Sequence, residues 1–97
     1  MLLNNSAATV SAAGYLKQNA PNPANLNTVI SFYVPANAER ALIKITDSKG
    51  SSLKTYSASR GEGRLNIKAG DLPAGIYNYS LYVNNKLVDT KQMMIVK

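Results

Sequence analysis

The stretch LPAGIYNYSLYVNN at residues 72–85 decides the fold class. Across residues 76–83, apolar and aromatic side chains alternate with other residues at the two-residue period of a strand that buries one face. The residues predicted to point inward are Tyr77, Tyr79, Leu81 and Val83. Asn84 and Asn85 follow directly and suit a two-residue hairpin loop, because asparagine tolerates the left-handed backbone of such a loop. Residues 86–96 are therefore expected to return as the last strand.

Four shorter runs with the same period come before this hairpin. They cover residues 28–34, 41–46, 53–57 and 64–68, with Ile30, Phe32, Val34, Ile43, Ile45, Leu65 and Ile67 predicted to point inward. The runs are separated by the turn-forming sequences PAN at 35–37, DSKG at 47–50 and RGEG at 60–63. Gly50 is expected to supply a left-handed position in its turn. With no helical period in any window, the sequence predicts an all-β sandwich or barrel of six or seven strands.

The segment at 72–77 also has the parts of the tyrosine corner found in immunoglobulin-like sandwiches. Leu72 would fill the core, Pro73 and Gly75 would shape the bend, and Tyr77 would return its hydroxyl to the upstream backbone. The alternative is an ordinary buried tyrosine on a strand, and the local sequence leaves both interpretations open.

Composition excludes several classes of function. The 97 residues suffice for one domain, and they include no Cys, His or Trp. Disulfide frameworks, zinc fingers and Ser–His or Cys–His nucleophiles are therefore excluded. The five acids Glu39, Asp47, Glu62, Asp71 and Asp89 lie at least eight residues apart, and Asp47, Glu62 and Asp71 are assigned to turns. No catalytic residue, metal ligand or cofactor is predicted.

The net charge of +6 comes from 11 basic and 5 acidic residues spread along the chain. Without a basic stripe or a recognition helix, nucleic acid is not an expected partner. No apolar run approaches the roughly 20 residues that span a bilayer, so membrane insertion is not expected either. Residues 1–14 are small and weakly polar and are interpreted as a flexible linker or expression remnant, with the domain covering residues 15–97.

Tyrosine is the dominant aromatic residue, with six tyrosines against one phenylalanine. Tyr33, Tyr56 and Tyr82 are predicted to lie on faces opposite the core. Such a row suits contact with sugars or with a partner protein. A carbohydrate-binding or adhesion module is therefore one candidate function, and a passive immunoglobulin-like spacer is another.

Five segments come in a recognisable order along the chain. They are LKQNAPNP at 16–23, TVISFYVP at 28–35, DSKG at 47–50, LPAGIY at 72–77 and KQMMIVK at 91–97. Together they resemble the type A C-terminal sorting domain of the type IX secretion system of Bacteroidetes, over residues 15–97. The resemblance includes the basic residues at both ends of the last segment, which is expected to close the chain.

The resemblance implies an immunoglobulin-like antiparallel β-sandwich of about seven strands in two sheets. It also implies a non-catalytic signal domain that follows a cargo protein and folds in the periplasm. The outer-membrane translocon would recognise the domain, and a sortase-like peptidase would cut it off upstream. The cargo would end at the outer-membrane surface or outside the cell. Cargo identity, cleavage site and oligomeric state stay open.

The sorting motif implied by the resemblance is the closing segment, with Lys91, Met93, Met94, Ile95, Val96 and Lys97 as its residues. The translocon is expected to read this edge strand by main-chain pairing and by charge contacts with the two lysines. Pro21, Asn22 and Pro23 are expected to serve the fold by ending the pairing of the first edge strand.

Overall fold

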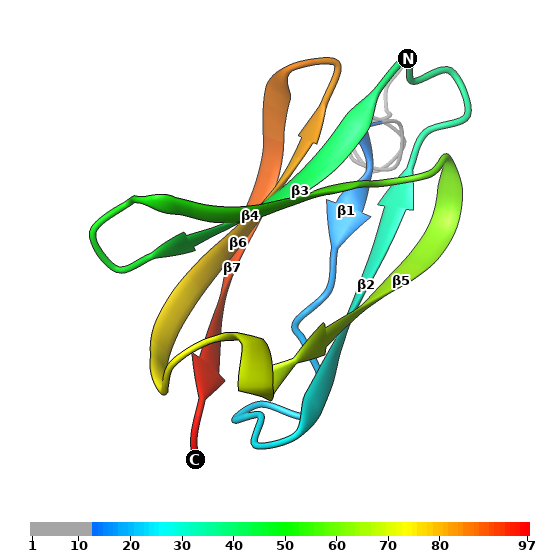
Figure 1. The fold of residues 1–97 in the computed structure, drawn as a ribbon. Helices are drawn as coiled ribbons and strands as arrows, with labels where there is room; N and C mark the ends of the chain where they lie inside the picture. The colour runs from blue at the N-terminus through cyan, green and yellow to red at the C-terminus, as the bar shows by residue number, and fades with distance from the viewer. Residues whose placement is uncertain (1–12) are drawn as a thin grey trace, which may run out of the picture.

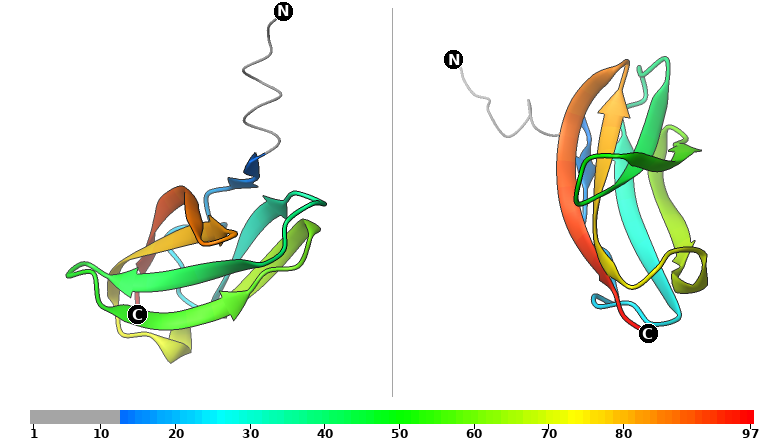
Figure 2. Two further views of the ribbon diagram at one scale, coloured as in Figure 1. Left: turned by 90° about the horizontal axis from the view of Figure 1, so that it is seen from above. Right: turned by 60° about the vertical axis from the view of Figure 1, so that its left-hand side comes forward.

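Two antiparallel sheets packed face to face make up the part of the chain that the structure describes, residues 13–97 of a computed structural model (Figure 1). Its strands are β1 (Tyr15–Leu16), β2 (Asn27–Val34), β3 (Ala41–Asp47), β4 (Ser52–Ser57), β5 (Gly61–Lys68), β6 (Gly75–Val83) and β7 (Lys86–Ile95). One sheet has the order β1-β2-β5 and the other β4-β3-β6-β7. Figure 2 shows the two layers and the twist of each sheet. The predicted all-β sandwich of about seven strands is confirmed.

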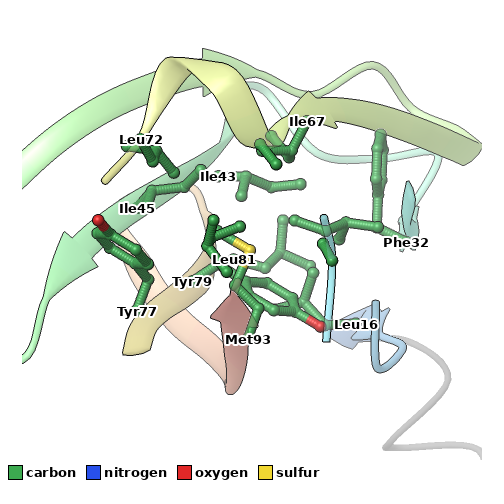
Figure 3. Packing of buried hydrophobic residues seen from close by; sticks show 14 of the residues in the cluster. Leu16, Phe32, Ile43, Ile45, Ile67, Leu72, Tyr77, Tyr79, Leu81 and Met93 are labelled. Carbon is green, nitrogen blue, oxygen red and sulfur yellow. The ribbon is translucent and has the colours of Figure 1, made fainter. Parts of the chain in front are cut away.

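The core lies between the sheets and follows the alternation of the sequence. On β2 every second side chain from Thr28 to Val34 is buried, and on β6 the buried residues are Tyr77, Tyr79 and Leu81. Ile43 and Ile45 of β3 lie beside Leu81 and Tyr79 on the inner face of the four-stranded sheet (Figure 3). Burying a side chain of this size stabilises a fold by about 1.5–3 kcal/mol. The hydrophobic pattern therefore fixes which face of each strand turns inward.

The hairpin between β6 and β7 has the predicted two-residue loop. Asn84 and Asn85 have φ values of 52° and 68°, the left-handed pair that a type I′ turn requires. The Asn84 side-chain oxygen also accepts hydrogen bonds from the backbone N–H groups of Glu39 and Arg40, at 2.8 and 3.1 Å. This turn therefore holds the β2–β3 connection in place as well as reversing the chain.

The turn at 47–50 is likewise confirmed. Gly50 has a φ of 89°, and its N–H donates to the carbonyl oxygen of Asp47 at 3.0 Å. The Asp47 carboxylate accepts the backbone N–H groups of Lys49 and Ser51, each at 2.9 Å. The acid thus caps its turn, as aspartate often does.

The tyrosine corner is present. The hydroxyl of Tyr77 donates to the carbonyl oxygen of Pro73 at 2.5 Å, and Leu72 is 4% exposed in the core. Gly75 opens β6 directly after the bend. The sequence left open a tyrosine corner or an ordinary buried tyrosine, and the structure has the tyrosine corner.

Replacing Tyr77 by Phe should remove this clamp and leave the ring in the core. We expect a loss of about 1 kcal/mol in the free energy of unfolding, the usual net value of one hydrogen bond. Urea denaturation measures it. Tyr82→Phe is the matched control, because no side-chain hydrogen bond involves the Tyr82 hydroxyl within residues 13–97.

The predicted break at residues 60–63 is wrong. Strand β5 already begins at Gly61, so Glu62 lies on a strand and not in a turn. Gly63 serves packing here, because it pairs with Phe32 and a Cβ atom at this position would collide with the Phe32 ring. A glycine that makes room for a ring looks in sequence like one that makes a turn.

Candidate functional site

The closing strand β7 divides the predicted sorting motif between two faces. Its pairing with β6 sets Met93 opposite Tyr77 and Ile95 opposite Gly75. Met93 and Ile95 are each 1% exposed, whereas Met94 is 40% exposed on the outer face. Val96, just beyond the strand, is 37% exposed. The buried pair anchors the strand, and the exposed pair is available for contact.

The two lysines of the motif are already engaged within the domain. Lys91 Nζ lies 3.8 Å from a carboxylate oxygen of Asp89, an ion pair that is one-third exposed. Lys97 Nζ donates to the carbonyl oxygen of Ala69 at 2.9 Å. Exposed ion pairs contribute only about 0–1 kcal/mol, so a partner with a better acceptor can compete for Lys91.

The outer main-chain edge of β7 is covered near its end by residues 18–24, which we call the clasp. Ala24 donates its N–H to Met94 O and accepts from Val96 N, both at 2.9 Å. The Asn22 side-chain oxygen accepts the N–H of Met94 at 2.9 Å. The Gln18 side chain donates to the carbonyl oxygen of Gln92 at 2.5 Å. The expectation that this end of the strand offers its main chain for pairing is therefore wrong for the folded domain.

The two prolines of the clasp lie where the chain changes sheets. Ala20 makes a bridge to Val29 of β2, and Ala24 makes a bridge to Ile95 of β7. Pro21 and Pro23 stand between these two bridges and have no N–H to give to either sheet. At the lower end of Figure 2 (right), this crossing lies next to the end of β7.

A buried polar network ties the clasp to the core. The Tyr79 hydroxyl donates to Lys17 O and accepts from the backbone N–H of Asn19, both at 2.8 Å. The Asn19 side chain donates to the Thr28 hydroxyl at 2.8 Å, and that hydroxyl donates to Pro21 O at 2.8 Å. Asn19 is 3% exposed and Thr28 is fully buried. Within residues 13–97, no buried side-chain nitrogen or oxygen lacks a partner.

Sequence reasoning missed this network, although one signal of it was present. Thr28 has the same phase as the inward Ile30 and Phe32, and a hydroxyl at an inward position needs a partner. The partner comes from Asn19, inside the segment that the resemblance had already singled out.

Replacing Tyr79 by Phe should leave the Lys17 carbonyl and the Asn19 N–H without their buried partner. We expect a loss of about 1–3 kcal/mol in the free energy of unfolding at pH 7. Burial raises the pKa of Tyr79 to about 12 from an ordinary value near 10. The folded state holds this proton more tightly, so its stabilisation is complete below about pH 10 and falls as the pH rises toward 12.

Urea titrations of both proteins from pH 8 to 12 measure this effect. The wild type should lose more stability than Tyr79→Phe across the upper half of that range, because the two proteins differ only in the Tyr79 hydroxyl. Equal losses would show that Tyr79 does not carry the effect.

The three tyrosines predicted to lie away from the core do not share a surface. Tyr33 lies on the outer face of the three-stranded sheet and Tyr82 on the outer face of the four-stranded sheet. Tyr56 pairs with the inward Ile43 and packs against the core, so its predicted orientation is wrong. The carbohydrate-binding alternative therefore has no common tyrosine row to support it.

The predicted linker lies mostly outside the described residues, since the structure describes the chain from Ala13 onward. Gly14, assigned to the linker, is buried with a φ of 97°, and a Cβ atom there would lie 2.6 Å from Tyr33 O. Gly14 is thus already packed against the sandwich.

Within residues 13–97, no three His, Cys, Asp or Glu side chains gather into a set that could bind a metal. Over the same residues, no helix has the length and apolar character to cross a membrane.

Comparison with known proteins identifies the family. Residues 20–97, more than three quarters of the chain, match the family model described as "Secretion system C-terminal sorting domain". No curated protein matches the chain. The match includes all of β2 to β7 and most of the clasp. The chain belongs to the family of secretion system C-terminal sorting domains, which carry the sorting signal of type IX secretion.

Proposed function

We propose that the folded domain is a non-catalytic address that directs the protein joined to its N-terminal end through the type IX secretion system. The precursor crosses the periplasm, the translocon recognises the domain at the outer membrane, and a sortase-like peptidase then cuts it off within the linker before residue 15. The cargo stays on the cell surface or is released. The family match over residues 20–97 is the observation that carries this proposal.

Recognition uses side chains of the closing segment. Met93 and Ile95 hold the segment in the core, and the clasp occupies its main-chain edge. Met94 and Val96 remain exposed, and Ile76, which pairs with Met94, is 45% exposed beside them. We call Ile76, Met94 and Val96 the apolar strip.

Lys91 and Lys97 flank the closing segment from its other side, because Lys91 pairs with the inward Tyr79, on the opposite face of β7 from Met94, and Lys97 reaches Ala69. Each can exchange its internal acceptor for an acidic group of the translocon. The translocon thus contacts a surface that exists only when the domain is folded, because β6 and β7 both contribute to the apolar strip.

A reporter fusion in a type IX-competent host tests this function. The reporter, followed by all 97 residues, should reach the cell surface, and it should stay inside in a host without the translocon. Val96→Asp should lower surface delivery by about tenfold, as expected when a charge replaces an apolar side chain that packs against a partner. Leu53→Asp is the matched control, because Leu53 is 42% exposed on β4, far along the sheet order from β7. Normal delivery of Val96→Asp would overturn the role of the apolar strip.

A further inference from the structure

The outer face of the three-stranded sheet holds an ordered group of six side chains, which we call the platform. Strand pairing sets them in two rows: Tyr15, Tyr33 and Glu62 in the first, and Lys17, Ser31 and Arg64 in the second. Each row crosses the sheet from β1 or its continuation, through β2, to β5. All six residues alternate with inward ones, so their side chains share the solvent face.

The first row is held together by its own contacts. The rings of Tyr15 and Tyr33 are stacked with their centroids 5.6 Å apart. The Tyr15 hydroxyl donates to a Glu62 carboxylate oxygen at 3.3 Å, and partial desolvation together with that carboxylate raises the pKa of Tyr15. The one acid of the platform is thus engaged by a tyrosine.

The second row presents positive charge. Neither Lys17 nor Arg64 has a carboxylate within ion-pair distance among residues 13–97. Lys17 Nζ lies 5.8 Å from the Tyr15 ring centroid, which leaves its N–H donors to solvent. All of the platform residues except Tyr33 line a hollow of about 510 Å³. Tyrosine and arginine are enriched in protein–protein interfaces, and the platform combines two tyrosines with the unpaired cations Lys17 and Arg64.

The platform lies at the point where the linker leaves the domain. Gly14 packs against the carbonyl oxygen of Tyr33, and the exposed Ala13 directly precedes it. The chain upstream of residue 13 therefore begins beside the first row of the platform. The apolar strip, by contrast, lies on the other sheet.

We propose that the platform is a docking surface for the peptidase that removes the domain, and that it binds an acidic, carboxylate-bearing patch of that enzyme. This inference rests on the proposed function, since it requires that the linker is cut. Docking on the platform holds the peptidase next to the linker and raises its effective concentration there. Complementary charge speeds the encounter, and the effect weakens as salt rises.

The test separates delivery from cleavage. Lys17→Glu/Arg64→Glu, in the reporter fusion, should reach the surface in normal amount and be cut at least about tenfold more slowly in a pulse-chase. Lys49→Glu/Lys86→Glu makes the same charge change at two exposed lysines of the four-stranded sheet and its turn, and should be cut normally. Lys17→Arg/Arg64→Lys keeps the charge and should also be cut normally.

Each other result overturns the inference. The inference is wrong if Lys17→Glu/Arg64→Glu is cut at the wild-type rate, or if this variant and Lys49→Glu/Lys86→Glu slow cleavage equally. It is also wrong if Lys17→Glu/Arg64→Glu blocks delivery, because the platform would then be a contact for the translocon. Thermal unfolding verifies that each variant is folded. If Lys17→Glu/Arg64→Glu does not fold, Lys17→Gln/Arg64→Gln takes its place in the test. Loss of delivery by the wild-type fusion itself would instead remove the proposed function.

Discussion

Ile95→Asp should abolish both the stable fold and surface delivery. Ile95 is 1% exposed between the sheets, opposite Gly75 at the end of β7. A carboxylate at this position loses its hydration and gains no partner, and the cavity left by isoleucine adds to the cost. We expect a loss on the order of 4–5 kcal/mol, which is comparable with the whole stability of a small domain. Circular dichroism and urea denaturation measure the fold, and the reporter fusion measures delivery.

Met94→Asp is the matched control for this prediction, one residue away on the opposite face. Met94 is 40% exposed, so the new carboxylate stays hydrated and the free energy of unfolding should change by less than about 1 kcal/mol. Delivery should nevertheless fall, because the apolar strip loses its central residue. Full delivery of a folded Met94→Asp variant would contradict side-chain recognition, and a stable Ile95→Asp variant would contradict the inward placement of the strand.

Local pattern predicted the strands because alternation and turn chemistry act over neighbouring residues. The inward phase of Ile30 and Phe32 and the asparagine turn were readable in this way, whereas the corner at Tyr77 was one of two interpretations that the local sequence left open. The prediction failed at Gly63, where a distant ring decides the role of the glycine.

The clasp was beyond local reasoning, because its contacts join residues far apart in the sequence. Asn22 and Met94 are separated by 72 positions, and Asn19 and Tyr79 by 60. Nothing within either segment indicates which partner completes its hydrogen bonds. The resemblance marked the segment around Asn22, but the expected role was to end one strand, whereas the structure also has it covering another. The resemblance likewise marked the closing motif as one continuous run, and it did not separate the buried residues of the motif from the exposed ones.

A chain that begins at Ala20, where the family match begins, should be much less stable than one that begins at Ala13. The shorter chain lacks Leu16, which is 4% exposed in the core and contributes about 2 kcal/mol. It also lacks both partners of the Tyr79 hydroxyl, at a further cost of about 1–3 kcal/mol. We therefore expect the folding unit to begin before Ala20, as the proposed domain of residues 15–97 does, because the boundary of the family match divides the clasp.

Urea denaturation of the two purified chains measures the difference, which we expect to be on the order of 3–5 kcal/mol from these two terms. The shorter chain also bares the edge of β2 that Tyr15 and Leu16 cover, so it should self-associate at high concentration in light scattering. Leu16→Ala/Tyr79→Phe in the longer chain is the control, because it removes the same burial and hydroxyl contacts while keeping the covered edge. It should be destabilised to a similar extent and stay monomeric. Equal midpoints for the chains from Ala13 and Ala20 would show that β1 and the network around Asn19 contribute nothing to the fold.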